Sequence, residues 1–499
     1  MNLQRLCKRL VIAATLIATL FTIVDAQTAG TTLITGATLI DGTGSAPRKV
    51  AVRIGAGKIT AVGALTPRAG ETVLDASGLV LAPGFIDIHN HSERGLDEDS
   101  KAATQVLQGI TTLAAGPDGG SPFPVGDWLA KRAAAPANVN VMSFVGHATV
   151  RQRVMGAAYK RHATATEIAA MARLVEQGMR EGAVGLSSGL EYDIGNPAAT
   201  EELITLARVA AKHRGIYMSH IRDEADDMMK ALAEAIRIGR EAKIPVQISH
   251  IKLGTVNVWN KAAAAIALVD KARRAGVDMT ADCYPYDAWS STITVLVPSR
   301  RHEDLDAVRR GIADVGGANN ILITRCQAHP DYEGQTLGDI ARETFIDPAA
   351  VYMRIVKDGG AGVVCRSMQE ADIEMFYRQP WVMVASDGGI GMRHPRGAGA
   401  FPRVLGVYVR ERKWITLPQA IHKMTGMPAA RLGLRDRGLV RPGMKADLVL
   451  FDADRIIDHS TMTSPFLPAT GVRHVFVNGA QVVRDGVVTE AKSGQVIRR

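Results

Sequence analysis

Histidine residues in this chain follow short apolar segments. In FIDIHNH, residues 85–91, an apolar run ends in His89 and His91, which are separated by one residue. Residues i and i+2 of a β-strand project to the same side, so both imidazoles can reach a single ion. Imidazole nitrogens combined with a carboxylate oxygen are typical ligands of zinc. Alone the H-x-H pair is a weak signal, because a histidine at a strand end is more often a hydrogen-bonded core residue.

The same pattern recurs along the chain. Five more ionisable side chains follow predicted apolar strands: His147, His220, His250, Asp387 and, after a short turn, Asp118. Such a series, each member closing a different strand, predicts one shared metal site. For His147 we predict a structural role, or one of orienting the ligands, in preference to ligation.

These side chains require elements that bring strand ends together. The predicted strands are residues 85–91, 110–116, 139–147, 183–190, 215–220, 244–250, 277–283 and 381–387. The intervals carry helical patterns, as in the segment 226–243, where Met228, Met229, Leu232, Ala235 and Ile236 share one face. Eight strands with crossover helices predict an α/β fold, a (β/α)8 TIM barrel, whose C-terminal strand ends converge on one mouth.

The two ends of the chain have similar sequence patterns. Short β-rich runs begin at residue 32 and return near the C-terminus, where Asn478-Gly479 is a strong hairpin signal. We predict one small β-sandwich built from residues 27–84 and 436–499, with the barrel over 85–435. Residues about 288–345 are predicted as an insertion after the seventh strand.

The first 26 residues have the pattern of a signal peptide. Arg5, Lys8 and Arg9 precede the apolar run LVIAATLIATLFTIV, and VDA offers small residues before Gln27. A membrane anchor is the alternative, but the run is about 15 residues long and a spanning helix needs about 20. We predict cleavage after Ala26, a periplasmic or secreted protein, and no membrane association afterwards.

Composition excludes several classes. With 46% hydrophobic and 22% charged residues, the 499-residue chain suits a globular protein with a large core. Three cysteines remain after removal of the signal peptide, too few for a disulfide scaffold. The net charge is +9, but no Lys/Arg tract with interleaved aromatics is present, so nucleic-acid binding is not expected.

Several longer motifs carry a resemblance. GFIDIHNH, MSHIRDE, PVQISHIK, ADCYPY, ASDG and HPRGAGAFPRVLG, in this order, resemble the amidohydrolase superfamily. GLSSGLEY and HKMTGMPAARLGLRDRGLVRPGMKADLVLFD are similar to its N-acyl-D-amino-acid deacylase (D-aminoacylase) branch, and the similarity spans residues 32–485. The resemblance implies a metal-bearing barrel with a bipartite β-sandwich. It also implies hydrolysis of small N-acyl-D-amino acids with one or two divalent ions, Zn²⁺ above all.

The resemblance also assigns the metal ligands. His220 and His250 would hold a tightly bound ion, while His89, His91 and Asp387 would line a second position. The family has a cysteine in the turn after strand 2, where this chain has Asp118 in AAGPDGGS. A carboxylate is a harder ligand and can bridge two ions. The alternative is that Asp118 is a solvent-facing turn residue.

Amide hydrolysis needs a base for water and an acid for the leaving nitrogen, and Asp387 is the candidate for both. Alternatively Asp387 only ligates metal or orients His89. By resemblance, Lys252 and Arg396 would bind the substrate carboxylate, since a guanidinium holds a carboxylate through two parallel hydrogen bonds. Tyr284 and Ser290 would contribute hydroxyl groups to the same pocket.

Two other functions remain open at this level. Cyclic-amide hydrolases of the hydantoinase or dihydroorotase kind share the barrel, but they use a carboxylated lysine on strand 4, and AVGLSSGLEY contains none. Glu191, at the end of that segment, is kept as a candidate for a metal or substrate role. A non-catalytic exported binding protein is the third alternative, although such a protein would be expected to have lost metal ligands.

Overall fold

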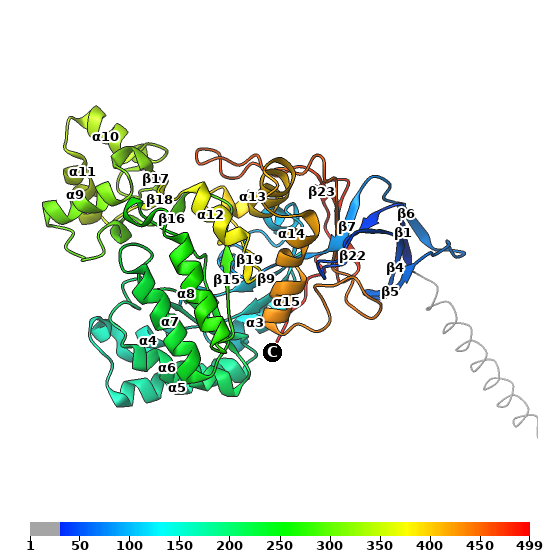
Figure 1. Ribbon diagram of the computed structural model, residues 1–499, viewed down its shortest axis with the longest axis horizontal. Helices are drawn as coiled ribbons and strands as arrows, with labels where there is room; N and C mark the ends of the chain where they lie inside the picture. Colours follow the sequence, from blue (N-terminus) through cyan, green and yellow to red (C-terminus); the bar gives the residue numbers. More distant parts are fainter. Residues whose placement is uncertain (1–29) are drawn as a thin grey trace, which may run out of the picture.

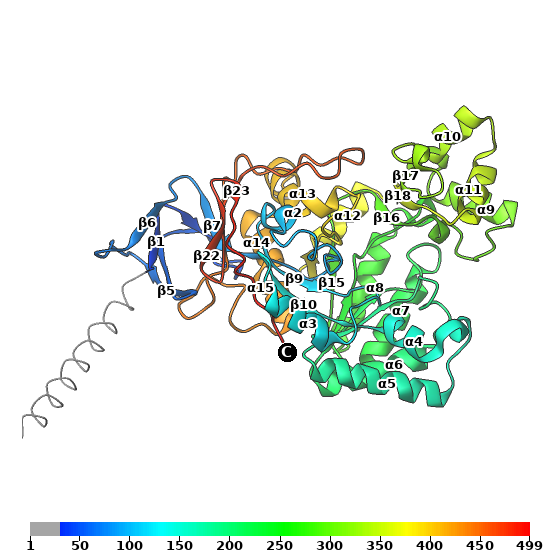
Figure 2. The same ribbon diagram turned by 180° about the vertical axis from the view of Figure 1, so that it is seen from behind.

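The computed structural model describes residues 30–499. The predicted signal peptide, residues 1–26, lies outside the described residues. Among the described helices, none is long and apolar enough to cross a membrane. The molecule is elongated, with a β domain at one end, a barrel in the middle and an insertion at the other end (Figures 1 and 2).

Parallel strands form the barrel. They are β8 (Phe85–Asp87), β9 (Ile110–Ala115), β10 (Asn140–Ser143) continued by β11 (Val145–Gly146), β12 (Gly185–Gly189), β13 (Ile216–His220), β14 (Val246–Ile248), β15 (Met279–Cys283) and β19 (Val382–Val384). Pairing runs in chain order through two arcs, β8 to β10 and β11 to β19. A parallel bridge between Asn90 and Gly388 joins the first strand to the last. All eight strands occur where the sequence predicts them, the third interrupted at Phe144.

The barrel strands are buried on both faces, and apolar side chains alternate there with buried polar ones such as Asn140, Ser187 and Gln247. Ile86, Met142, Met218 and Met383 belong to a buried cluster that fills the barrel interior. The chain terminus contributes to this end of the core, since Val496 bridges Val141 and residue 497 packs on the interior cluster. The last residues therefore leave the β domain, to which the sequence had assigned the whole segment 436–499.

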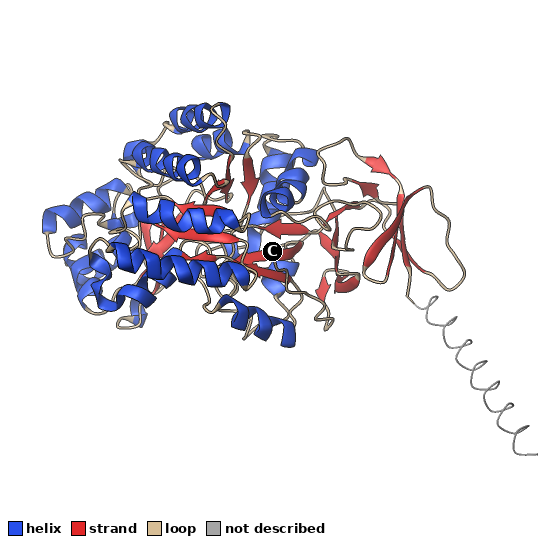
Figure 3. Ribbon diagram, turned by 90° about the horizontal axis from the view of Figure 1, so that it is seen from below, coloured by secondary structure: helices blue, strands red, loops and turns tan. Residues whose placement is uncertain are grey.

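Helices surround the barrel strands (Figure 3). They include α3 (Val125–Ala134), α4 (His147–Met155), α5 (Ala165–Arg180), α6 (Thr200–Lys212), α7 (Met228–Ala242), α8 (Ala262–Arg274), α12 (Glu370–Tyr377), α13 (Arg396–Arg403), α14 (Leu417–Met424) and α15 (Gly426–Leu432). The predicted face of α7 is buried, except for Met229, which is half-buried. Thr164 and Glu167 form a capping box at the start of α5.

The insertion after β15 is larger than predicted. Its three-stranded antiparallel sheet has the order β16 (Trp289–Thr292), β18 (Gly362–Cys365), β17 (Ile321–Arg325). Three helices cover it: α9 (Leu305–Asp314), α10 (Leu337–Thr344) and α11 (Pro348–Lys357). The expected end near residue 345 is wrong, because β18 is the central strand of this sheet and pairs with both neighbours.

Both ends of the chain build the β domain. One sheet has the order β5 (Lys58–Gly63), β4 (Ala51–Gly55), β1 (Thr32–Thr35), β6 (Thr72–Asp75). The other has the order β23 (Val487–Val488), β22 (Ala480–Arg484), β21 (Val472–Val477), β20 (Leu448–Phe451), β7 (Val80–Pro83), β2 (Thr38–Leu39), β3 (Arg48–Lys49). Antiparallel pairing of β7 with β20 joins the two ends. Asn478 and Gly479 both have positive φ, 49° and 84°, as a type I′ hairpin turn requires.

Candidate functional site

Ionisable side chains from separate strands converge at the C-terminal mouth of the barrel. Asp118 Oδ2 lies 3.1 Å from His89 Nε2, 3.4 Å from His91 Nε2 and 3.6 Å from His250 Nε2. His220 Nδ1 lies 2.9 Å from His250 Nε2. One carboxylate oxygen therefore faces three imidazoles, and a fourth imidazole adjoins them.

Asp387 completes this cluster. Its Oδ1 lies 3.2 Å from His91 Nε2 and 3.3 Å from His89 Nε2. Two groups of metal-binding type share Asp118, and each has its candidate ligand atoms within 4.8 Å of one another: His89, His91, Asp118 and Asp387, and then Asp118, His220 and His250. A carboxylate common to two groups can bridge two ions.

The donor set fits a divalent cation. Asp118 Oδ1 is buried and accepts no hydrogen bond within residues 30–499, although an unsatisfied buried carboxylate oxygen is costly. A metal ion would satisfy it, and nitrogen with carboxylate oxygen is a donor set that zinc accepts. Asp118 is buried, so it is not the solvent-facing turn residue of the alternative interpretation.

The turn that carries Asp118 is held by its neighbours. Asp118 has φ 54°, in the left-handed region. Ser187 Oγ donates to Gly116 O at 2.6 Å and accepts from Gly119 N at 3.2 Å. A Cβ at Gly189 would lie 2.3 Å from the carbonyl oxygen of Asp118, so this strand position requires glycine. Strand β12 thus fixes a strained backbone conformation of the kind that clusters at functional sites.

The charges of the cluster are adapted to a cation. Burial raises the pKa values of Asp118 and Asp387, but the surrounding cationic groups hold both well below their ordinary value. Burial lowers the pKa of His91, but hydrogen bonds with Asp118 and Asp387 outweigh it and raise the pKa to about 9. The pKa values of His89 and His250 are also raised, so without a cation protons on His89, His91 and His250 balance the ionised carboxylates.

Two further carboxylates lie beside the second ring nitrogens of the imidazoles. His250 Nδ1 lies 3.0 Å from Glu224 Oε1, and His89 Nδ1 lies 3.4 Å from Asp282 Oδ1. Carboxylates that contact the second nitrogen of a metal-binding histidine fix its orientation and raise its basicity. Neither was predicted as a site residue. Asp282 could have been found by the rule that located the others, because it lies near the end of a predicted strand.

The four predicted substrate-binding residues also reach this region. Arg396 Nη1 lies 2.8 Å from Asp387 Oδ2, and its guanidinium lies 4.8 Å from the centre of the Tyr284 ring. Lys252 Nζ forms an ion pair with Glu224. Ser290 lies on β16, in the insertion, and lines the cavity. Both cations are thus already paired with carboxylates, which the sequence did not predict.

Glu191 and His147 have different surroundings. Glu191 Oε2 lies 2.8 Å from His220 Nε2, and Glu191, His220 and Glu224 form a third group of metal-binding type. His147 begins α4 and forms a hydrogen bond of 2.8 Å with Glu202 on α6. No hydrogen bond within the described chain joins His147 to the cluster. It connects two helices, in agreement with the structural alternative.

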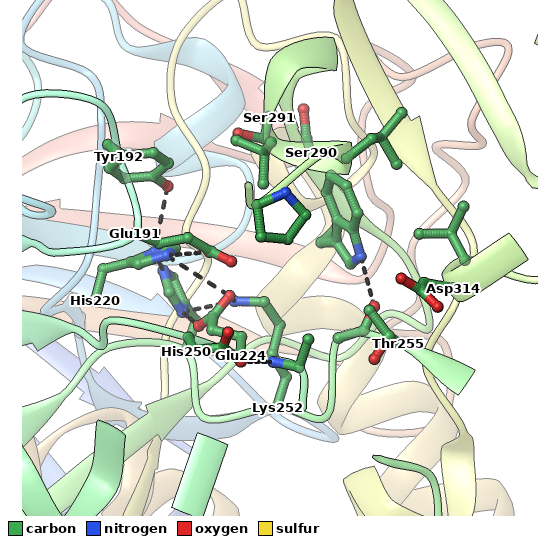
Figure 4. A pocket seen from close by; sticks show the side chains of 18 of the residues that line it. Glu191, Tyr192, His220, Glu224, His250, Lys252, Thr255, Ser290, Ser291 and Asp314 are labelled. Carbon is green, nitrogen blue, oxygen red and sulfur yellow. Dashed lines mark hydrogen bonds and ion pairs between the residues drawn. The ribbon is translucent and has the colours of Figure 1, made fainter. Parts of the chain in front are cut away.

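A cavity of about 300 Å³ opens beside the cluster. Figure 4 shows Glu191, His220 and His250 on one side and Asp314 on the other. Lys252, Ser290, Asp387 and Arg396 also line it. The cluster therefore adjoins a space that suits a small molecule.

Comparison with known proteins agrees with this geometry. The model of the amidohydrolase family matches residues 72–483. The D-aminoacylase of Alcaligenes xylosoxydans xylosoxydans is 36% identical, over 94% of this chain and 97% of that protein. The N-acyl-D-glutamate deacylase of the same organism is 35% identical, over 94% of this chain and 96% of that protein.

Solved structures give the same result. The N-acyl-D-glutamate deacylase of Bordetella bronchiseptica, in complex with zinc and a phosphonate mimic of the tetrahedral intermediate, superposes with a TM-score of 0.86. It is 35% identical, and the match covers 94% of this chain and 99% of that one. A D-aminoacylase structure, with the same identity and coverage, gives 0.85. The predicted fold class is confirmed. The chain belongs to the amidohydrolase family, in its N-acyl-D-amino-acid deacylase branch.

Proposed function

We propose that this protein hydrolyses the amide bond of N-acyl-D-amino acids, giving a carboxylate and a free D-amino acid. The observation that carries the proposal is Asp118, whose buried carboxylate joins two groups of metal-binding histidines at the edge of a cavity. Arg396 and Lys252 line the same cavity, where a substrate carboxylate would bind. The relatives named above act on compounds of this class.

The cofactor is zinc, as one or two divalent ions. His220, His250 and Asp118 would hold one ion, and His89, His91 and Asp387, again with Asp118, would hold a second. A bound ion polarises the substrate carbonyl and lowers the pKa of water towards neutrality. Glu224 lies 3.0 Å from His250 Nδ1 and would keep this imidazole turned towards the centre.

Asp387 moves the proton. Its low pKa keeps the carboxylate ionised at neutral pH, so it can accept a proton from water and then donate it to the leaving nitrogen. Arg396, 2.8 Å away, contributes to that low pKa. A substrate carboxylate that binds Arg396 would weaken the ion pair between Arg396 and Asp387. The pKa of Asp387 would then rise, and Asp387 would become a stronger base. Substrate binding would then prepare the site for proton transfer.

Purified protein with measured metal content tests the function directly. Paired N-acetyl-D- and N-acetyl-L-amino acids should show turnover of the D series, and chelation should abolish it. Turnover of cyclic imides or ureides, with neither acyl series hydrolysed, would refute the proposal and favour a cyclic-amide hydrolase. The absence of lysine from β12 speaks against that outcome.

We also propose that the enzyme works in the periplasm or outside the cell, with Gln27 as its first residue. The basic residues and apolar run before Ala26 support this location. Expression of the full chain, cell fractionation and N-terminal sequencing provide the test. An intact N-terminus on protein confined to the cytoplasm would contradict it.

A further inference from the structure

The cavity carries carboxylates outside the histidine cluster: Asp223, Asp226, Asp227 and Asp314. Asp227 lies 2.7 Å from Lys230. The other three form no ion pair with any group in residues 30–499. Asp223 accepts hydrogen bonds from two backbone N–H groups and Asp314 accepts one from Asn257, so these carboxylates are held by neutral donors and their negative charge is not paired with a cation.

The lysine and the arginine that line this cavity already have acidic partners. Lys252 is paired with Glu224, and Arg396 is paired with Asp387. A second acidic group on a substrate would meet repulsion on the acidic side, while a cationic group would be attracted. Electrostatic complementarity of this kind contributes more to specificity between substrates than to affinity.

Asp314 lies at the C-terminal end of a helix, and its carboxylate accepts a hydrogen bond of 2.7 Å from Asn257 Nδ2. It is the last residue of α9, and Gly311 and Val315 beside it also line the cavity. The C-terminus of a helix carries partial negative charge, which disfavours a carboxylate and favours a cation. Asp226 differs, because it lies just before α7, where a carboxylate is stabilising. Figure 4 places Asp314 across the cavity from His220.

The wall between these groups suits a long aliphatic chain. Trp289, Val295, Leu296 and Pro298 line it with apolar surface. Lysine and arginine bury their methylene groups on such surfaces while their charged ends remain at a polar rim. The acyl carbonyl would bind at the cluster, the α-carboxylate at Arg396, and the charged end near Asp314.

Building on the proposed deacylase function, we propose that the preferred substrates are N-acyl derivatives of basic D-amino acids, with the side-chain cation bound beside Asp314. This names a specificity residue in the insertion, away from the barrel that carries the chemistry. Acidic D-amino acids are expected to be poor substrates.

The test compares two substrates of nearly equal shape. N-acetyl-D-arginine carries the guanidinium, and N-acetyl-D-citrulline replaces it by an uncharged urea. We expect kcat/KM to favour arginine about fivefold, the upper range for a partly exposed ion pair. Asp314→Asn should bring the arginine-to-citrulline ratio close to one. Asp306→Asn removes the same charge from the other end of α9, on an exposed residue, and should leave the ratio unchanged.

The possible results distinguish failure of the inference from failure of the proposed function. Citrulline turned over as fast as arginine would overturn the inference and leave the deacylase function standing. An arginine preference that survives Asp314→Asn would refute the role of Asp314. Hydrolysis of neither compound, nor of any other N-acetyl-D-amino acid, would remove the proposed function and the inference with it. A further comparison tests the acyl half. If kcat/KM is higher for glycyl-D-norleucine than for N-acetyl-D-norleucine, and equal for N-acetyl-D-arginine and N-acetyl-D-citrulline, the recognised cation belongs to the acyl half and the side-chain assignment is wrong.

Discussion

At the scale of single residues, Asp118 has the largest expected effect, because it belongs to both metal-binding groups. Asp118→Asn keeps the shape of the side chain and removes its charge. We expect loss of bound metal and a fall in kcat/KM of at least about 100-fold, the upper range seen for residues that merely support a metal ligand. Elemental analysis and kinetics provide the measurement. Asp127→Asn, at an exposed position of α3, is the matched control. Full metal content in Asp118→Asn would contradict the assignment.

Arg396 has two partners to satisfy, Asp387 and the proposed substrate carboxylate. Arg396→Lys keeps the positive charge, but a lysine cannot donate two parallel hydrogen bonds to the substrate carboxylate. We expect KM for N-acetyl-D-methionine to rise about tenfold or more, since hydrogen bonds to charged groups contribute about 1.5–3 kcal/mol. The corresponding amide, N-acetyl-D-methioninamide, lacks the carboxylate and should show a smaller rise in KM. An equal rise for both compounds would mean that Arg396 acts only through Asp387.

At this scale the sequence predicts which residues belong to the site better than it predicts the contacts between them. His89, His91, His220, His250 and Asp387 could be placed together because strand ends of a barrel must converge. The pairing of Lys252 with Glu224 could not, because it depends on how two loops after different strands meet. Loop geometry has no periodic pattern from which it can be read.

At the scale of elements, α14 is tied to the start of β19, the strand that leads to Asp387. Lys423 Nζ donates to Val382 O at 2.7 Å and also to Gln379 O. Burial lowers the pKa of this ammonium to about 8, from 10.5 when exposed. The charged form is therefore disfavoured in the folded state, at a cost of about 3 kcal/mol from 1.36 kcal/mol per pKa unit.

That cost is present in full below pH 8 and disappears as the pH rises to 10.5, because only the unfolded state still binds the proton in this window. Relative to Lys423→Met, the wild type should gain up to about 3 kcal/mol in unfolding free energy across the window. Urea denaturation at pH 7 to 10.5 measures this. Lys357→Met, an exposed lysine at the end of α11, should show no such slope, and parallel curves for wild type and Lys423→Met would refute the prediction.

Helices and strands could be predicted where a polar loop separates them. The barrel strands, buried on both faces and bounded by polar loops, could be located from the sequence. The boundary within VGHATV was not predicted, because no loop separates β11 from α4 and His147 is the first residue of the helix. The end of the insertion was missed for a related reason: β18 is a short apolar segment whose partners, β16 and β17, lie far away in sequence.

At the scale of the whole molecule, the cluster links parts of the barrel that are distant along the chain. The candidate ligands come from the ends of β8, β13 and β14, from the loop after β9 and from the residues after β19. A metal ion held by this set binds only the folded state, so its binding energy adds to the stability of the whole barrel. Removal of metal should therefore lower the melting temperature of the entire transition and not of one segment.

The size of this effect follows from mass action. With free zinc at 100 times its Kd, the folded state gains about 2.7 kcal/mol relative to the chelated protein. Calorimetry should show one transition that moves to lower temperature with chelator and returns with added zinc. In His220→Ala the shift should be much smaller, because one group loses a ligand. An unchanged melting temperature on verified loss of metal would show that these strand ends do not hold an ion in common, and with that the basis of the proposed chemistry would fall.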